Sequence, residues 1–311
     1  MDAKYKNNMN LPTVAQMQLT DHGGSSYVVQ LTDGSFIVID GGHSDKKNFN
    51  SYTANSNVLW NYLTANAKDG VPTVSAWMIT HFHSDHVDTA SEFLIKHKGD
   101  MRVLSFAYNH PGHEEQLRDV EREDYWQEAM DCYPDAEKRI LTTGEKLTFA
   151  GCEIDVLITE ADRYPDYRKD QNFISAAFRL KFECGHSFMV TGDCPAPRTY
   201  ALCDETSAVY RKDEELRAEV LQVPHHGLPI GDPDELKKNV EFYKRVSPKV
   251  CLISQYSKRY YSDERFYSDT WYDNDYLIKS AGRENCYHHT QTTVVDMTSL
   301  EVRTFEEEMI F

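Results

Sequence analysis

The sequence predicts a layered α/β fold, with two mixed sets of strands inside and helices outside. Three observations lead to this fold class. Short apolar or alternating runs recur along the 311 residues, helical patterns separate several of them, and the hydrophobic content of 40% is that of a globular protein. No internal repeat and no Gly/Ser-rich or Pro-rich linker divides the chain, so we expect one domain over residues 1–311.

The expected strands are short runs rich in branched and aromatic residues that end at turn-forming residues. A Thr-Asp-Gly-Ser turn joins the first two, and Ala150-Gly151 and Cys184-Gly185 mark turns in the middle of the chain. In chain order these strands are residues 26–31, 35–40, 74–80, 102–108, 146–150, 152–158, 173–182, 187–193, 219–224, 249–254, 292–297 and 301–305.

Four segments place apolar residues at the spacing of an amphipathic helix. Because these helices alternate with strands, we expect them to cover the outer faces of the sheets. They are residues 56–67, 89–98, 114–130 and 232–246.

The chain is acidic, with 50 Asp and Glu against 33 Lys and Arg and a formal net charge of -17. Such a charge repels polyphosphate chains and disfavours nonspecific nucleic-acid binding. Bound divalent metal would relieve part of this acidity. We therefore expect a small-molecule substrate rather than a nucleic-acid partner, and the sequence leaves the oligomeric state open.

The N-terminal segment lacks the basic cluster and apolar core of a secretory signal, and no run approaches the ~20 apolar residues of a membrane span. These observations favour a cytoplasmic location with no membrane contact. The seven cysteines are scattered, without a C-x-x-C pair, and we expect reduced thiols.

The run THFHSDHVD, at the end of the strand predicted over residues 74–80, is crowded with metal-binding side chains. In an extended segment His81 and His83 point the same way, while Asp85 and His86 follow where the chain turns into a helix. This arrangement can serve two adjacent ions. Imidazole and carboxylate together suit zinc, with manganese or iron as alternatives. A polar capping loop is the competing interpretation, which four such residues after a buried strand disfavour.

The residues from His81 to His86 meet the H-x-H-x-D-H signature in full, and the sequence resembles the metallo-β-lactamase superfamily. The segments FIVIDGG at 36–42, FMVTGD at 188–193 and LQVPHHG at 221–227 are similar to further strands of that family. The resemblance implies a four-layer αββα sandwich of two mixed sheets with outer helices. It also implies a metal-dependent hydrolase with one or two zinc ions.

Two aspartates at strand ends have roles that the resemblance implies and that their chemistry supports. A carboxylate at Asp193, after an apolar strand and the pliant Gly192, can bridge two cations and offset their repulsion. Asp40, before Gly41-Gly42, is expected to orient a ligand or brace the loop rather than bind metal. The alternative for each is a turn aspartate.

The adjacent histidines of VPHHG leave open which one binds metal. Many relatives carry Val-Pro-Gly-His-Gly there, which implies His226 as the ligand and His225 as a neighbour that contacts substrate. The alternative is that both are polar loop residues.

The sequence departs from the family where many relatives carry another metal-binding histidine, between residues 144–147 and Asp193. It has Asn172 and Ser175 instead, in an N-x-x-S pattern. This pattern is similar to the branch that contains the hydrolase domain of the competence protein ComEC and phosphorylcholine esterases. The missing ligand is then water or one of four other histidines: His110, His113, His288 or His289.

Eight aromatic residues interleave with charge over residues 254–276. They suit the wall of a substrate pocket or ordinary packing. Base stacking would use the same pattern, but the acidic residues among them disfavour it.

The site as a whole predicts metal-assisted hydrolysis, in which cations lower the pKa of a bound water toward ~7 and stabilise developing charge. Asp85 would hold metal and orient the water, and His225 and Asn172 would contact the reacting group. A phosphoester or phosphodiester suits two cations. The alternatives are a lactone or thioester substrate, a noncatalytic metal-binding module and a di-iron oxidoreductase. The oxidoreductase would need a flavin-binding domain, which the sequence does not show.

Overall fold

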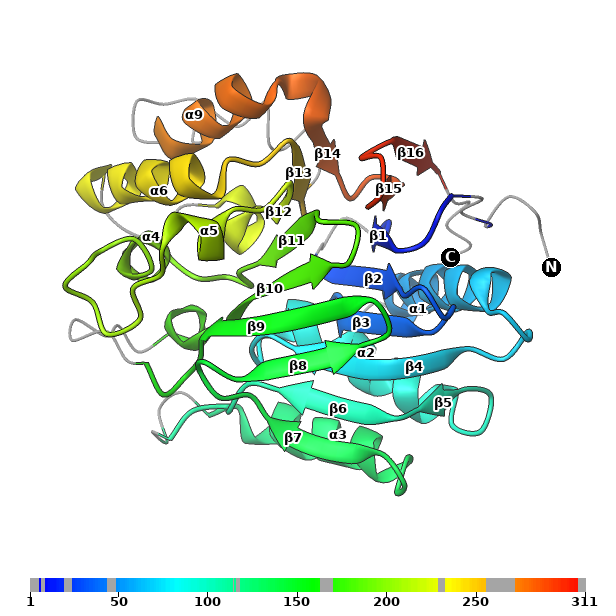
Figure 1. The fold of residues 1–311 in the computed structure, drawn as a ribbon. Helices are drawn as coiled ribbons and strands as arrows, with labels where there is room; N and C mark the ends of the chain where they lie inside the picture. The colour runs from blue at the N-terminus through cyan, green and yellow to red at the C-terminus, as the bar shows by residue number, and fades with distance from the viewer. Residues whose placement is uncertain are drawn as a thin grey trace.

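The computed structural model describes residues 6, 9–19, 24–43, 49–113, 115, 118–162, 170–228, 233–255 and 272–306. Within these residues, two sheets pack face to face and helices cover the outer face of each (Figure 1). Both sheets mix parallel and antiparallel strands, as the sequence predicts.

The first sheet is nine-stranded and draws on both ends of the chain. Its order is β16-β15-β1-β2-β3-β4-β6-β7, and β5 also pairs with β4. The strands are β1 (Thr13–Gln16), β2 (Ser26–Gln30), β3 (Phe36–Asp40), β4 (Thr73–Ile79), β5 (Arg102–Val103), β6 (Ser105–Tyr108), β7 (Glu137–Ile140), β15 (Thr292–Asp296) and β16 (Val302–Phe305).

The second sheet is seven-stranded and comes from the middle and late chain, in the order β14-β13-β12-β11-β10-β9-β8. Its strands are β8 (Lys146–Phe149), β9 (Cys152–Ile158), β10 (Ala177–Phe182), β11 (Ser187–Val190), β12 (Val220–Gln222), β13 (Val250–Ile253) and β14 (Cys286–His288).

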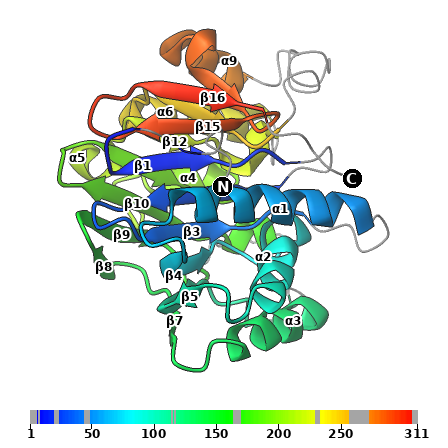
Figure 2. The ribbon, with the colours of Figure 1, turned by 90° about the vertical axis from the view of Figure 1, so that its right-hand side faces the viewer.

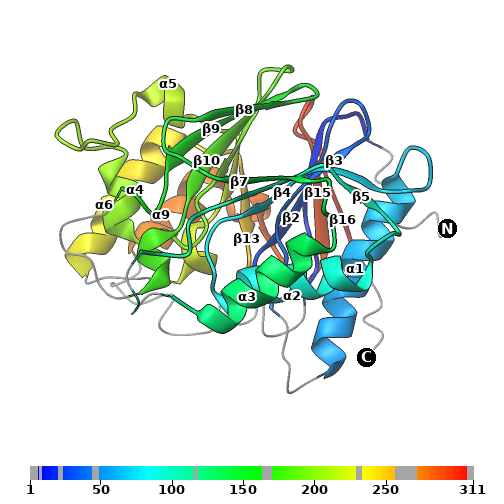
Figure 3. The same ribbon diagram turned by 90° about the horizontal axis from the view of Figure 1, so that it is seen from below.

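The helices divide between the two outer faces, which Figures 2 and 3 show from two further sides. Those on the first sheet are α1 (Phe49–Asn66), α2 (Ser84–Lys96) and α3 (Val120–Asp131). Those on the second are α4 (Ala196–Ala201), α5 (Asp213–Leu216), α6 (Pro233–Val246) and α9 (Tyr272–Ala281). No described helix is both long enough and apolar enough to cross a membrane.

Three hydrophobic cores separate the layers. The core between the sheets includes Phe178 and Phe188, which are fully buried. A second core joins Trp77 of the first sheet to Phe93 of α2, with ring centroids 5.5 Å apart. A third packs Phe242 of α6 against the second sheet. These three cores give the four-layer αββα sandwich that the family resemblance implies.

Several elements differ from the sequence predictions. Strand β1 was not predicted because its four residues, TVAQ, form too short a run to show a strand pattern. Strand β7 was missed because its sequence, EKRI, is charged and mostly exposed, as suits a sheet edge. Helix α2 begins at Ser84 rather than at the predicted residue 89, which carries the end of the histidine cluster into its first turn.

The remaining differences concern element ends and unpredicted elements. Helix α1 begins earlier than predicted, at Phe49, and α3 begins later, at Val120. The predicted strand 102–108 is interrupted at Leu104. Strand β14 and the helices α4, α5 and α9 were not predicted. All seven cysteines are free thiols, and of the aromatic segment 254–276, residues 256–271 lie outside the described residues.

Parallel strands bring distant residues to one edge of the sandwich. Strands β3, β4 and β6 run parallel, so their carboxyl ends lie side by side. Strands β11, β12 and β13 do the same in the second sheet. The loops after these strands are therefore neighbours, and ligands of open α/β sheets bind at such carboxyl ends.

Gly41 allows the end of β3 to approach α2 closely. A Cβ added at Gly41 would lie 2.5 Å from the backbone nitrogen of Ala90 and 2.7 Å from its Cα. We expect Gly41→Ala to destabilise the protein by about 1–3 kcal/mol, as overpacking does. Urea unfolding would measure this. An unfolding free energy of Gly41→Ala within about 0.5 kcal/mol of the wild type would contradict the close approach.

Candidate metal centre

The histidine cluster lies where β4 passes into α2. His81 and His83 are in the extended segment after β4, while Asp85 and His86 are in the first turn of α2. The backbone N–H of Ser25 donates to the carbonyl of Asp85 at 3.0 Å. Since the apolar side of α2 is also buried in the core, the start of the helix is held in place.

Asp193 reaches the cluster from the second sheet, just after β11. Gly192 has a φ of 52°, and a Cβ there would lie 2.9 Å from the Cβ of Thr80, so the two sheets meet at this point. The hydroxyl of Ser175 accepts the backbone N–H of Asp193 at 3.2 Å. The serine of the N-x-x-S pattern thus supports the position of the aspartate.

The two histidines after β12 adopt a conformation that non-glycine residues seldom take. His225 and His226 have φ values of 49° and 57°. The Nδ1–H of His225 donates to the carbonyl of Leu228 at 2.8 Å, and its backbone N–H donates to that of Gly192 at 3.2 Å. This strained turn directs the His226 ring into the site, where it is 5% exposed.

Ligand atoms of four residues from two segments converge around Asp193. Its Oδ1 lies 3.2 Å from Nε2 of His86, and its Oδ2 lies 3.2 Å from Nε2 of His226. That same nitrogen of His226 lies 3.1 Å from Oδ2 of Asp85. His81 also faces this carboxylate, with Nε2 3.9 Å from Oδ2 of Asp193.

These atoms form two groups that share Asp193. The first contains His81, His83 and Asp193, and the second contains Asp85, His86, Asp193 and His226. Two ligands of a tetrahedral zinc ion lie about 3.4 Å apart, given zinc–ligand distances near ~2.1 Å. The nitrogen–oxygen separations of 3.1–3.9 Å around Asp193 are comparable with this value.

Buried polar atoms at the centre of the site make no hydrogen bond to any described residue. They are Nε2 of His81, Nε2 of His86, Oδ1 of Asp193 and both ring nitrogens of His226. A buried polar atom left in this state costs about 1–3 kcal/mol. Imidazole nitrogens and carboxylate oxygens that face one another in this way fit a divalent cation.

Carboxylates and imidazoles in the site shift one another's pKa values. Burial disfavours charge on every group, but Asp193 and Asp85 raise the pKa of His226 to about 10. Asp193 and Asp40 hold the pKa of His86 well above its ordinary value against burial. His226 and His86 hold the pKa of Asp193 well below its ordinary range, although burial opposes this. The carboxylates therefore require positive charge at the centre, which a divalent cation supplies.

Asp40 lies behind the site, at the end of β3, with a φ of 57°. Its Oδ2 accepts the Nδ1–H of His86 at 2.7 Å, and its Oδ1 accepts the backbone N–H of Thr80 at 2.9 Å. The first contact directs Nε2 of His86 toward Asp193. Asp40 therefore orients the ring of His86 beside the other candidate ligands, as expected from the sequence.

The remaining predicted residues are close to these groups. His225 places its Nε2 3.9 Å from Oδ2 of Asp193 and 3.4 Å from Nδ2 of Asn172. Asn172 is in the 3₁₀ turn η2 (Gln171–Ile174) and is 6% exposed. The geometry favours His226 over His225 as a ligand.

The histidines considered as replacements for the missing family ligand lie in other surroundings. His110 and His113 form a separate group with Glu160. His288 bonds the carbonyl of Gln255 through Nδ1 at 2.9 Å. His289 is fully buried, and burial lowers its pKa to about 3.

Sequence reasoning missed Asp170, whose Oδ1 lies 3.8 Å from Nε2 of His83. It also missed Glu160, a buried partner of His113. The position of Asp170, two residues before Asn172 in the N-x-x-S pattern, was the available signal for it.

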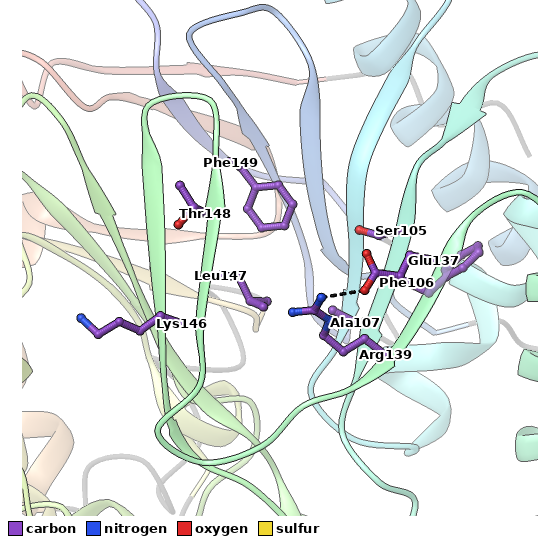
Figure 4. A pocket seen from close by; sticks show the side chains of 9 residues that line it. All are labelled: Ser105, Phe106, Ala107, Glu137, Arg139, Lys146, Leu147, Thr148 and Phe149. Atoms are coloured by element: carbon purple, nitrogen blue, oxygen red, sulfur yellow. Dashed lines mark hydrogen bonds and ion pairs between the residues drawn. The ribbon is translucent and has the colours of Figure 1, made fainter.

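A separate cleft of about 190 Å³ lies between the edge strands of the two sheets (Figure 4). Leu147 and Phe149 of β8 line one side, and Glu137 and Arg139 of β7 line the other. Arg139 pairs with Glu137 at 2.6 Å. Because its charges are paired and it contains none of the predicted site residues, we do not assign chemistry to this cleft.

Asp40→Asn tests the support of His86. Asparagine tolerates the left-handed backbone at this position, but its amide would lack one of the carboxylate oxygens that Thr80 and His86 share. We expect metal affinity to fall about 10–100-fold, as for other residues that orient metal ligands, with the fold retained. Metal titration alongside circular dichroism would measure this. Unchanged affinity would contradict the role of Asp40.

Residues 19–124 match the family model described as the metallo-beta-lactamase superfamily. This segment includes Asp40 and the four candidate metal-binding residues of the cluster, His81, His83, Asp85 and His86. The comparison with curated proteins finds no match.

Three solved structures that are similar to this chain are described here by their names. The CmlA beta-hydroxylase E377D mutant is 12% identical, with a TM-score of 0.51 over 92% of this chain and 54% of that one, so this chain spans about half its length. YhfI, a metallo-beta-lactamase fold protein from Bacillus subtilis, is 13% identical, with a TM-score of 0.49 over 89% of this chain and 96% of that one. A diphosphatase of the PhnP family is 14% identical, with a TM-score of 0.41 over 78% of this chain and 86% of that one.

At these identities a structural match concerns the fold and carries no statement about chemistry. The family model covers the segment that contains the histidine cluster. The two facing sheets with outer helices form the αββα sandwich around this segment. Residues 19–124 are therefore similar to the metallo-beta-lactamase superfamily, and the sheets and helices around them have the arrangement of that fold.

Proposed function

We propose that this protein is a metal-dependent hydrolase whose substrate is a small-molecule phosphoester or phosphodiester. The observation that carries the proposal is the set of buried nitrogen and oxygen atoms around Asp193 that face one another without hydrogen bonds. A site of this kind is matched to cations rather than to the protein's own donors.

The two ligand groups have distinct members. His81, His83 and Asp193 would hold one ion, and Asp85, His86, Asp193 and His226 would hold the other. When bound, such ions act as Lewis acids and activate water. The mixed imidazole and carboxylate donors favour zinc, and manganese and iron suit them as well.

The protein's own groups would position the reactants. Asp85 has a 28% exposed side chain, so it can contact water at the mouth of the site while its Oδ2 faces His226. Because Nδ1 of His225 donates to Leu228, its Nε2 keeps a lone pair directed toward Asp193 and Asn172. We assign His225 and Asn172 to contacts with the reacting group.

The phosphoester preference rests on charge. A chain with a net charge of -17 repels anions, and two cations in one site would offset that repulsion locally. The acidity also disfavours nucleic acid as a partner. A cytoplasmic location and similarity to the ComEC branch stay predictions from the sequence.

Two alternatives share the site. A lactone or thioester would use the same groups, and substrate profiling separates it from a phosphodiester. A noncatalytic metal-binding module is less consistent with the exposure of the site, because structural metal sites are closed whereas the His83 side chain is 37% exposed.

The function is tested with bis(4-nitrophenyl) phosphate and protein purified without chelator. We expect turnover with bound metal, and loss of turnover after dialysis against chelator. His83→Ala and Asp193→Ala should each lower turnover by more than about 100-fold, since removal of a ligand exceeds the 10–100-fold effect of an orienting residue. His186→Ala is the control, because His186 bonds Met297, away from the site.

Bound metal without turnover on phosphodiesters, lactones or thioesters would favour the noncatalytic module. Full activity in His83→Ala or in Asp193→Ala would show that the proposed metal site is wrong.

A matched pair of variants separates the roles of His225 and His226. Asparagine is among the residues best tolerated in the left-handed backbone of both positions. We expect His226→Asn to lower metal content, and His225→Asn to keep it while turnover falls by about 100-fold, as on losing one catalytic contact. Elemental analysis and kinetics on the same samples would measure both. Metal loss in His225→Asn alone would reverse the assignment.

A further inference from the structure

A group of facing side chains lies outside the metal centre and consists of His110, His113 and Glu160. Nδ1 of His113 lies 2.7 Å from Oε2 of Glu160, and the backbone N–H of His113 donates to Oε1 of the same carboxylate at 3.3 Å. The Glu160 side chain is 1% exposed, whereas that of His113 is 63% exposed. A buried carboxylate therefore holds an imidazole that faces solvent.

The geometry of the two rings does not suit a metal ion. The rings of His110 and His113 stack, with centroids 4.1 Å apart and planes 11° apart. The lone pair of an imidazole nitrogen lies in the plane of its ring, so parallel rings do not direct two lone pairs at one ion. Nδ1 of His110 also accepts the backbone N–H of Gly112 at 3.1 Å. These imidazoles are therefore suited to hydrogen bonding or proton transfer rather than to coordination.

The hydrogen bonds determine which ring nitrogen of His113 exchanges a proton. An ionised carboxylate only accepts hydrogen bonds, so Nδ1 of His113 donates to Glu160 and Nε2 is the nitrogen that gains or loses a proton. Burial and the neighbouring His113 lower the pKa of His110, so the stacked ring beside His113 is neutral. A buried carboxylate orients the proton-transferring imidazole of hydrolase triads in the same way.

The fully buried side chain of Asn109 joins this group to the metal centre. Its amide nitrogen donates to the carbonyl of Thr80 at 3.1 Å and to that of Ile174. Its amide oxygen accepts the backbone N–H of Glu160 at 3.0 Å. Thr80 directly precedes His81 of the metal centre, and η2, which ends at Ile174, carries a proposed substrate contact. One side chain thus holds three loops together at one edge of the sandwich.

Strand order leads to the same placement. Strands β4 and β6 are parallel neighbours, and their last residues, Ile79 and Tyr108, pair with each other. The loop that carries His110 and His113 therefore leaves the sheet next to the loop that carries the histidine cluster.

We propose that His113, oriented by Glu160, is the general acid that protonates the leaving group when the metal centre hydrolyses a phosphodiester. The inference rests on the proposed function and deepens it, because it assigns the source of the proton that the departing oxygen needs. His113 is then a catalytic residue, and Glu160 is a positioning residue that acts through it.

The proton transfer completes the hydrolysis. The oxygen of a water molecule bonds to phosphorus, the bond from phosphorus to the leaving oxygen breaks, and the leaving oxygen keeps the electron pair. Nε2 of protonated His113 gives its proton to that oxygen, which departs as an alcohol or a phenol. The attacking water loses one proton to solvent and His113 regains one from solvent, so each turnover consumes one water.

The need for this proton depends on the leaving group. 4-Nitrophenolate is a stable anion that departs without a proton, whereas unsubstituted phenolate is more basic and gains more from protonation. The test therefore compares bis(4-nitrophenyl) phosphate with diphenyl phosphate, using the full chain with bound metal. His113→Gln removes the proton-exchanging nitrogen and keeps a polar side chain. Glu160→Gln keeps an acceptor for Nδ1 and removes the charge.

We expect the wild type to hydrolyse both substrates. His113→Gln should lower kcat on diphenyl phosphate by about 100-fold or more, which is the usual contribution of a general acid, and kcat on bis(4-nitrophenyl) phosphate by about threefold or less. Glu160→Gln should cause a smaller loss with the same preference. His186→Gln is the matched control, since His186 bonds Met297, and should equal the wild type on both substrates. Circular dichroism and elemental analysis verify the fold and metal content.

Three results would overturn the role of His113 and leave the proposed function in place. The first is that His113→Gln loses both activities equally or loses neither. The second is loss of a bound ion in that variant, which would make His113 a metal ligand. The third is a wild type that hydrolyses bis(4-nitrophenyl) phosphate but not diphenyl phosphate. Absence of turnover on bis(4-nitrophenyl) phosphate in the wild type would instead overturn the proposed function, and the role of His113 with it.

Discussion

The buried carboxylate of Asp193 sets the requirements for the rest of the site. It is 1% exposed and lies where the two sheets meet, with ring nitrogens of His86 and His226 each 3.2 Å away. A buried negative charge without compensation is strongly destabilising, so the groups around it must bring positive charge. Its Oδ2 lies 3.2 Å from Nε2 of His226 and 3.9 Å from Nε2 of His81, so one oxygen faces members of both ligand groups.

The scaffold holds these groups by close approach and by local strain. Gly192 leaves room for Thr80 of the opposite sheet, and Gly41 leaves room for α2. Asp40, His225 and His226 have left-handed backbones, each of which costs about 1–3 kcal/mol in a non-glycine residue. Strain of this kind persists where surrounding structure determines it, and here all three residues serve the same site.

The two ligand groups differ in their access to solvent. His86 and His226 are buried, whereas the side chain of His83 is 37% exposed. The buried group resembles a closed structural site, and the exposed group resembles an open catalytic one. A substrate would therefore approach from the side of His83, beside Asn172 and His225. The cleft between the edge strands belongs to a different part of the molecule.

The sequence by itself determined the fold class and most of the candidate ligands that the structure brings together, because these depend on short-range patterns. Strands such as β3 and β4 are visible in the sequence as apolar runs. His81, His83, Asp85 and His86 all lie within six residues. Strand β7 is charged and β1 is short, so local pattern did not reveal them, and pairing with neighbouring strands makes them part of the sheet.

Only the tertiary structure decided how residues from separate segments meet. It brought Asp193 and His226 to the histidine cluster, turned His226 rather than His225 inward, and placed Asp170 beside His83. These outcomes depend on strand order, sheet packing and a strained turn. Local sequence does not encode them, because the contacts join residues tens to more than a hundred positions apart.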